Sequence, residues 1–298
     1  MSKNKAPIFL GAATALITPF SGGSIDFNAL GELIEYQLKN SIDALVVAGT
    51  TGEASTLNEE EYKSLVRFSV EKISGRVPVI VGTGSNDTAK AQKLTKIATE
   101  LGADACLTVT PYYNKATPRG LVESYKAIAS CTDLPIILYN VPTRTCVNIS
   151  IETYKELSSV ENIVAVKEAS PDIAACAELI FECGDDLDVY TGSDDQIIPT
   201  LSIGGVGTIS VASNVIPSEI HDICRCYLGG NTAQARALFK KYYSLMRAMF
   251  CEVNPIPVKT ALSMRGICRE EFRLPLCKIS DQNRKRLENI MRELELIY

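Results

Sequence analysis

The chain has 298 residues, of which 46% are hydrophobic, and its formal net charge is −5. This length suits one (β/α)-type barrel of about 250 residues with an extension. The acidic balance, without blocks of like charge, argues against binding to nucleic acid. No apolar run approaches the ~20 residues that a membrane span needs. We therefore expect a soluble, cytoplasmic protein with neither a membrane nor a nucleic acid as its partner.

The cysteines and the single histidine exclude several kinds of chemistry. Ten cysteines are too dilute in 298 residues for a disulfide scaffold. Cys224 and Cys226 form a C-x-C without a second pair, which does not fit a zinc site. The only histidine, His221, lies in a helical pattern, which leaves no Ser-His-Asp or Cys-His arrangement. We expect neither a metal nor another cofactor.

Eight short apolar runs recur along the chain and are separated by segments of helical periodicity. The runs are continuous rather than alternating, as in strands that are covered on both faces. Asp26 and Asn58 are expected to cap helices at their N-termini, and Gly102 to follow a helix. The predicted strands are 11–17, 43–49, 77–83, 104–110, 135–140, 162–168, 187–192 and 206–213, and the clearest helices are 27–40, 59–74 and 88–102.

Eight strands that alternate with helices predict an α/β protein with a (β/α)₈ TIM barrel. A doubly wound sheet is the structural alternative, but no G-x-G-x-x-G follows the first strand. From about Pro217 the pattern is helical to Tyr298, which is longer than one closing helix. We expect a barrel over residues 1–225 and a C-terminal helical extension, residues 226–298, packed on the barrel.

In such barrels the active site lies at the carboxyl ends of the strands. The polar residues that follow the apolar runs include two threonines, two tyrosines of one loop, a third tyrosine, an arginine and a lysine. Each alone has an ordinary explanation, such as a tight turn, a packed aromatic ring or a strand end in water. Their convergence on one rim favours a site. These residues are Thr50, Thr51, Tyr112, Tyr113, Tyr139, Arg144 and Lys167.

Without histidine or a metal set, the strongest catalyst that remains is an amine. An amine attacks a ketone only when it is neutral, and apolar surroundings favour that form. We expect Val164 and Val166 to supply part of the apolar surroundings of Lys167. Glu168 should point away from the barrel lumen, because adjacent strand residues alternate faces. Hydroxyl groups can shuttle protons, and Arg144 can bind a carboxylate bidentately. The residues predict a Schiff-base lyase or synthase that acts on a 2-keto acid.

Two other functions remain open from the residues alone. One is a phosphate-binding barrel isomerase that uses "TGSDD" and "GGVGT". It would be stabilised thermally by phosphorylated ligands and not by pyruvate. The other is a non-catalytic sensor of keto acids, which would bind pyruvate reversibly and show no turnover with any aldehyde.

Seven motifs in order resemble the class I pyruvate aldolase family, which includes dihydrodipicolinate synthase and N-acetylneuraminate lyase. They are "TALITPF", "GTTGEAS", "TPYYNK", "ILYNVPTRT", "VAVKEAS", "SNVIPSE" and "NPIPVKTAL", and they span essentially the whole chain. The resemblance implies a 4-hydroxy-tetrahydrodipicolinate synthase of lysine and diaminopimelate biosynthesis, which condenses pyruvate with L-aspartate-4-semialdehyde. Another pyruvate-dependent aldolase, such as N-acetylneuraminate lyase, is the alternative. Arg144 favours the synthase, because sialic-acid lyases usually carry a non-basic residue there.

The resemblance also assigns roles to residues. Lys167 would form the imine with pyruvate, and Tyr139 would relay protons together with Thr51 and Tyr113. Tyr113 would be lent across a subunit interface, which implies a homodimer or homotetramer. The other implied contacts are the pyruvate carboxylate with Thr50, Thr51 and the Ile209 main chain, and the aspartate-semialdehyde carboxylate with Arg144.

One departure from the family pattern concerns feedback by lysine. Where lysine-inhibited relatives typically carry a glutamate and a histidine in the effector pocket, this chain has Lys90 and Glu59, and Tyr62 replaces another histidine. Asn86 and Tyr112 are retained. Lys90 would place like charge against the effector's ammonium group. We therefore expect weak or absent inhibition by lysine.

Overall fold

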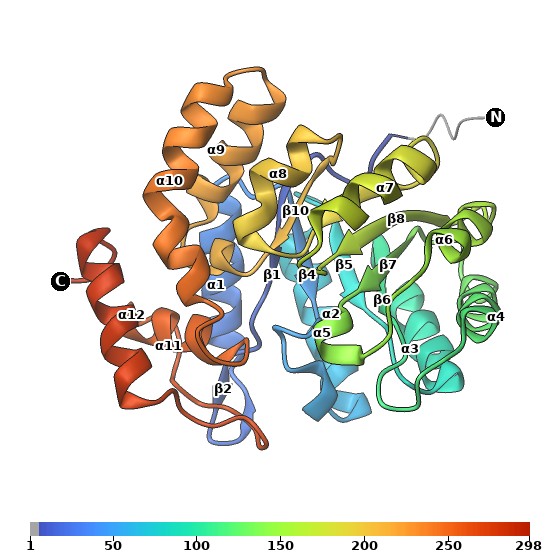
Figure 1. Cartoon of the computed structure of the whole chain (residues 1–298). Helices are drawn as coiled ribbons and strands as arrows, with labels where there is room; N and C mark the ends of the chain where they lie inside the picture. Colours follow the sequence, from blue (N-terminus) through green and yellow to red (C-terminus); the bar gives the residue numbers. More distant parts are fainter. Residues whose placement is uncertain (1–5) are drawn as a thin grey trace.

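A closed barrel of eight parallel strands forms the centre of the molecule (Figure 1). The computed structural model describes residues 6–298, so residues 1–5 of the expected barrel range lie outside the described residues. Each of the eight predicted apolar runs forms one barrel strand, which confirms the predicted (β/α)₈ class. In order around the barrel the strands are β1 (Gly11–Ala15), β10 (Gly207–Ser210), β9 (Asp188–Thr191), β8 (Ile163–Glu168), β7 (Ile136–Asn140), β6 (Ala105–Val109), β5 (Val79–Gly82) and β4 (Ala44–Val47).

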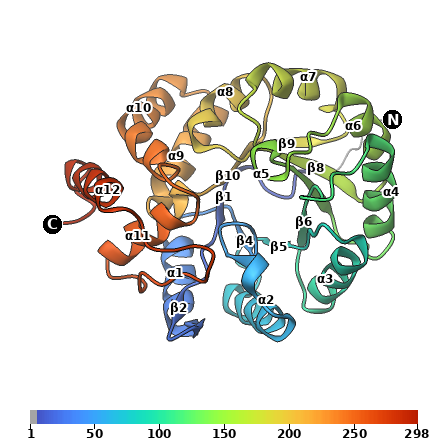
Figure 2. The same cartoon turned by 60° about the horizontal axis from the view of Figure 1, so that its bottom comes forward.

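Helices surround the barrel and cover the outer face of its sheet (Figure 2). This covering explains the unbroken apolar runs, because a strand between lumen and helices is buried on both faces. The helices of this layer are α1 (Phe27–Lys39), α2 (Glu59–Ile73), α3 (Thr88–Glu100), α4 (Pro118–Ala129), α6 (Ile151–Ser158), α7 (Ile173–Cys183), α8 (Ile197–Ser202) and α9 (Pro217–Leu228).

The predicted helix ends are confirmed. The Asp26 side chain caps α1 by accepting a hydrogen bond from the Ala29 N–H. Asn58 and Glu61 form a capping box at the start of α2. Gly102 follows α3 with a φ of 82°, a conformation that glycine adopts without a steric cost. The loops that precede and follow these helices are therefore defined by local sequence.

Two apolar cores lie on the two faces of the barrel sheet. The outer core fills the space between the strands and the helices, and a smaller inner core fills the lumen. Phe9, just before β1, stacks on Tyr190 with ring centroids 4.3 Å apart, and the Tyr190 hydroxyl donates to the Phe9 carbonyl at 2.8 Å. This contact lies at the amino end of the barrel, and both rings belong to the inner core.

The C-terminal part differs in detail from the prediction. The expected boundary between residues 225 and 226 falls inside α9, which continues to Leu228. The expected helical pattern is also interrupted, because residues 265–280 form no helix. The remaining helices gather beside α1 and α9 (Figures 1 and 2). They are α10 (Thr232–Ala248), α11 (Ile256–Met264) and α12 (Asp281–Glu293).

A small hairpin precedes α1 and was not predicted. Its strands β2 (Phe20–Ser21) and β3 (Ser24–Ile25) pair in antiparallel fashion. Gly22 and Gly23 form the turn with φ values of 60° and 82°, which two-residue hairpin turns require. Within residues 6–298, no helix combines the length and apolar character of a membrane span.

Candidate active site

A cavity of about 570 Å³ opens at the carboxyl ends of β7 and β8. Four of the predicted site residues line it: Thr51, Tyr139, Arg144 and Lys167. They come from three strand ends, those of β4, β7 and β8, as expected for a barrel whose strand ends deliver side chains to one rim. The predicted convergence of these four residues is confirmed.

Lys167 and Tyr139 are register partners on neighbouring strands. The Lys167 Nζ lies 4.3 Å from the centroid of the Tyr139 ring, and only 5% of Lys167 is exposed. No ion pair to Lys167 is found within residues 6–298. A Cβ at Gly192 would lie 2.8 Å from the Lys167 Cε, so this position beside the amine requires glycine. The amine is therefore enclosed by a ring and a glycine turn rather than by a carboxylate.

The expected apolar contribution of Val166 is wrong. Val166 belongs to the outer core, between the sheet and the helices. It precedes Lys167 directly on the strand, and adjacent residues point to opposite faces. The prediction for Glu168 is confirmed by the same alternation, because the Tyr154 hydroxyl of α6 donates to its carboxylate at 3.2 Å. Glu168 thus faces the helices and not the cavity.

The loop after β4 carries Thr51 and is held from two sides. The Thr18 hydroxyl donates to the Gly52 carbonyl at 2.7 Å. The Asn254 amide donates to the Thr51 hydroxyl oxygen at 3.0 Å. Thr51 is buried, and its hydroxyl hydrogen remains free to donate to another acceptor. This arrangement suits a group that passes a proton on.

Asn254 is a site residue that sequence reasoning missed. Besides its bond to Thr51, its carbonyl accepts a hydrogen bond from the Arg144 Nη2 at 3.0 Å. It is buried, it lines the cavity, and its Oδ1 has no hydrogen-bond partner in the described residues. Asn254 is the first residue of the motif "NPIPVKTAL", which resembles the family but whose first residue the resemblance gives no role.

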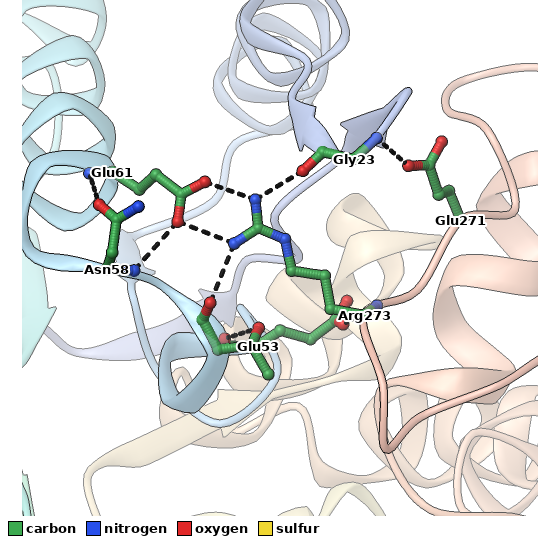
Figure 3. Close-up of polar contacts among 7 residues, drawn as sticks. Gly23, Glu53, Asn58, Glu61, Glu271 and Arg273 are labelled. Carbon is green, nitrogen blue, oxygen red and sulfur yellow. Dashed lines mark hydrogen bonds and ion pairs between the residues drawn. The ribbon is translucent and has the colours of Figure 1, made fainter.

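The C-terminal segment also fixes the Thr51 loop through a buried ion pair. The Lys259 Nζ of α11 donates to Glu53 Oε1 at 2.6 Å, and both side chains are almost fully buried. The Arg273 main-chain N–H donates to Glu53 Oε2 at 3.2 Å. Figure 3 shows the Arg273 guanidinium between the Glu61 carboxylate and the Gly23 carbonyl. Apart from Thr18, the residues that hold the loop therefore come from the C-terminal segment.

A larger cavity of about 770 Å³ adjoins the first, because Tyr139, Val141 and Arg144 line both. Thr50, which is exposed, lines the larger cavity and not the smaller one. Most residues of the expected effector pocket line the larger cavity as well; these are Glu59, Tyr62, Lys90 and Tyr112.

Two predicted site residues lie outside both cavities. Ile209 is completely buried in the inner core on β10, where it pairs with Ala13. Tyr113 is 91% exposed and has a φ of 71°. A bulky side chain seldom adopts this left-handed conformation. The structure of one chain therefore does not bring Tyr113 to Lys167.

Asp194 adds a buried carboxyl group in the loop after β9. Its Oδ2 accepts hydrogen bonds from the Val211 and Ala212 N–H groups, at 3.1 and 2.9 Å. Burial raises the pKa of the Asp194 carboxyl, and these hydrogen bonds and the charge of Lys167 oppose the rise. Asp194 thereby links the turn after β10 to the surroundings of Lys167.

Comparisons with known proteins agree on one family. A model described as the Dihydrodipicolinate synthetase family matches residues 8–294. The 4-hydroxy-tetrahydrodipicolinate synthase of Alkaliphilus oremlandii is 50% identical over 293 residues, which cover 97% of this chain and 100% of the relative. The crystal structure of dihydrodipicolinate synthase from Aquifex aeolicus matches with 45% identity and a TM-score of 0.95, over 97% of this chain and 99% of that chain. A synthase from Cyanidioschyzon merolae, solved with lysine bound, matches with 38% identity and a TM-score of 0.93, over 97% and 99% of the two chains.

Proposed function

Because this chain belongs to the dihydrodipicolinate synthetase family and acts as a 4-hydroxy-tetrahydrodipicolinate synthase, we propose that Lys167 forms a Schiff base with pyruvate in the smaller cavity. The single observation that carries this proposal is the buried, unpaired Lys167 amine 4.3 Å from the Tyr139 ring, in a cavity that Thr51 and Arg144 also line. The names of the relatives favour the synthase over a sialic-acid lyase.

The chemistry needs an amine and groups that move protons. The neutral Lys167 Nζ adds to C2 of pyruvate, and loss of water from the carbinolamine leaves the imine. Tyr139 donates and accepts the protons of these steps, and the Thr51 hydroxyl extends the relay. Loss of a methyl proton gives an enamine, whose carbon attacks the aldehyde of L-aspartate-4-semialdehyde. The amino group of that substrate then displaces Lys167 and closes the ring.

Two carboxylates have to be held during this reaction. Thr51, which lines the smaller cavity, binds the pyruvate carboxylate. The family resemblance adds Thr50, which lines the adjoining cavity, and the main chain of the buried Ile209. Arg144 binds the carboxylate of L-aspartate-4-semialdehyde. Arg144 is exposed and keeps guanidinium N–H groups beyond the one bonded to Asn254, so it can still bind a carboxylate bidentately.

Tyr113 completes the proton relay from a partner subunit, in a homodimer or homotetramer. Its 91% exposure and left-handed backbone support this assignment, because both present the ring to the outside of a single chain. The site of one subunit would then be incomplete without its partner.

Reduction with borohydride tests the Schiff base. The protein is incubated with pyruvate and borohydride, and the modified peptide is mapped by mass spectrometry. We expect the label at Lys167 alone. Lys259 serves as an internal control, because it is also buried but bonded to Glu53. A label elsewhere, or none, would refute the assignment, and stabilisation by phosphorylated ligands rather than by pyruvate would favour the isomerase.

A further inference from the structure

A buried hydrogen-bond network lies directly behind Lys167 and Tyr139, on the helix-facing side of the sheet. The next residues along the two strands, Glu168 and Asn140, are register partners as well. Because side chains alternate along a strand, the first pair faces the cavity and the second pair faces the helices. The same two strand ends therefore carry the reacting groups on one face and this polar pair on the other.

Glu168 is surrounded by hydrogen-bond donors. The Asn140 Nδ2 lies 3.1 and 3.0 Å from its two carboxylate oxygens. The Ser170 N–H donates at 2.7 Å and the Tyr154 hydroxyl at 3.2 Å. Asn140 also donates to the Asn148 Oδ1 at 2.7 Å. A set made only of donors matches an ionised carboxylate, which can only accept hydrogen bonds.

The surroundings of Glu168 leave little room for an alternative arrangement. Glu168 and Asn140 are both buried. Burial and the neighbouring Glu168 charge raise the pKa of the Tyr154 hydroxyl well above its ordinary value, so that hydroxyl stays a donor. A buried polar group that loses its hydrogen-bond partner destabilises the fold. The network therefore favours one relative position of the two strand ends.

We propose that Glu168 is a positioning residue, which acts through Asn140 to hold the ends of β7 and β8 so that Tyr139 and Lys167 keep their reactive geometry. This inference rests on the proposed roles of Lys167 and Tyr139. A main-chain hydrogen bond also joins the two strand ends, because the Ala169 N–H donates to the Asn140 carbonyl at 2.9 Å. A displacement of about 1 Å in a reacting group can lower a rate about 100-fold.

Exchange of the two partners tests the proposal. Glu168→Gln replaces one of two accepting carboxylate oxygens with an NH2 group, which cannot accept from Asn140, Ser170 or Tyr154. Asn140→Asp places a second carboxylate against Glu168. The double variant, Asn140→Asp with Glu168→Gln, again pairs an acceptor with a donor, in reversed order. We expect each single change to lower kcat at least about tenfold, and the double variant to recover most of that loss. KM for L-aspartate-4-semialdehyde should change less than kcat, because no member of the network is bonded to Arg144.

A carboxylate at the opposite end of the barrel provides the control. Asp43 also accepts from a main-chain N–H, that of Ala12 at 2.8 Å, and from a side chain, that of His221. Asp43→Asn should lower the melting temperature and leave kcat unchanged. A merely structural role of Glu168 predicts the same pattern for Glu168→Gln.

The proposal is overturned if kcat of Glu168→Gln equals that of the wild type, or if the double variant is no more active than Asn140→Asp. The second comparison decides the matter if Glu168→Gln does not fold. Borohydride labelling distinguishes a wrong assignment of Lys167 from a wrong role of Glu168. A wild-type label at another residue refutes the assignment of Lys167 and this inference with it, whereas a label at Lys167 with unaffected variants refutes the inference alone.

Discussion

Lys167 and Lys259 show how neighbouring groups give two buried lysines different roles. Lys259 bonds to the Glu53 carboxylate at 2.6 Å and to the Glu271 carbonyl at 2.8 Å, so two of the three N–H donors of its ammonium group are used. Lys167 contacts a tyrosine ring and forms no ion pair within residues 6–298. We therefore assign chemistry to Lys167 and structure to Lys259.

Lys90 determines the expected response to L-lysine. It lines the larger cavity, where Glu59 already pairs with Lys93 and Lys63. Hydrogen bonds from these two lysines lower the pKa of the Glu59 carboxyl to about 2. A free ε-ammonium group would meet the charge of Lys90 and find no free carboxylate at Glu59. We expect no inhibition by L-lysine below about 1 mM in a steady-state assay.

The variant Lys90→Glu should become sensitive to L-lysine, because it replaces a like charge with an opposite one. Norleucine, which lacks the ε-ammonium group, is the control and should inhibit neither protein. Micromolar inhibition of the wild type would contradict the prediction.

At the scale of elements, the Lys259–Glu53 pair joins α11 to the loop that carries Thr51. Removal of one partner from a buried pair leaves an uncompensated charge, which costs about 3–5 kcal/mol. Lys259→Met should lower the free energy of unfolding by that amount. The double variant with Glu53→Gln should regain part of the loss. Urea unfolding measures both, and equal stabilities of the single and double variants would show that the charge of Glu53 is not the cause.

The barrel elements could be predicted from the sequence because their signals are local. Each strand is a continuous apolar run, and Asn58 with Glu61 defines the start of α2 within four residues. The β2–β3 hairpin was missed because its strands have only two residues each. Strand alternation placed Glu168 correctly, and the same rule excludes Val166 from the surroundings of Lys167.

The candidate site could be predicted only where residues follow the strand ends. Thr51, Tyr139, Arg144 and Lys167 obey that rule and meet in one cavity. Asn254 does not follow a barrel strand, so the rule misses it. Its hydrogen bond to Thr51 joins residues that are 203 positions apart in the chain. Neither the hydrophobic periodicity nor the residues next to Asn254 indicate a contact over this distance in the sequence.

At the scale of the whole molecule, His221 and Asp43 connect α9 to the amino end of the barrel. The His221 Nδ1 lies 2.9 Å from the Asp43 Oδ2. The hydrogen bond to Asp43 raises the pKa of His221 above 6.5, and Asp222 adds to the rise, while burial and Arg225 oppose it. Because the folded-state pKa exceeds the unfolded one, this pair stabilises the fold fully below about pH 6.5. The contribution is lost as the pH rises through the raised pKa.

The variant His221→Gln should therefore be less stable than the wild type at about pH 5.5, and the difference should shrink toward about pH 8.5. Urea unfolding at several pH values measures this difference. Asp43→Asn, which removes the carboxylate of the same pair, should show the same trend. A stability difference from the wild type that grows with pH would contradict the assignment.

The exposed Tyr113 has a consequence for mixtures of defective subunits. If each site takes its tyrosine from the neighbour, Tyr113→Phe and Lys167→Ala damage the same site from two different chains. Each variant alone has only damaged sites. A hybrid dimer of the two has one site in which both defects coincide and one site in which both groups are intact. The two inactive proteins should then complement each other genetically, because each hybrid dimer would have up to half the activity of the wild type. This result would depend on the position of the Tyr113 ring alone.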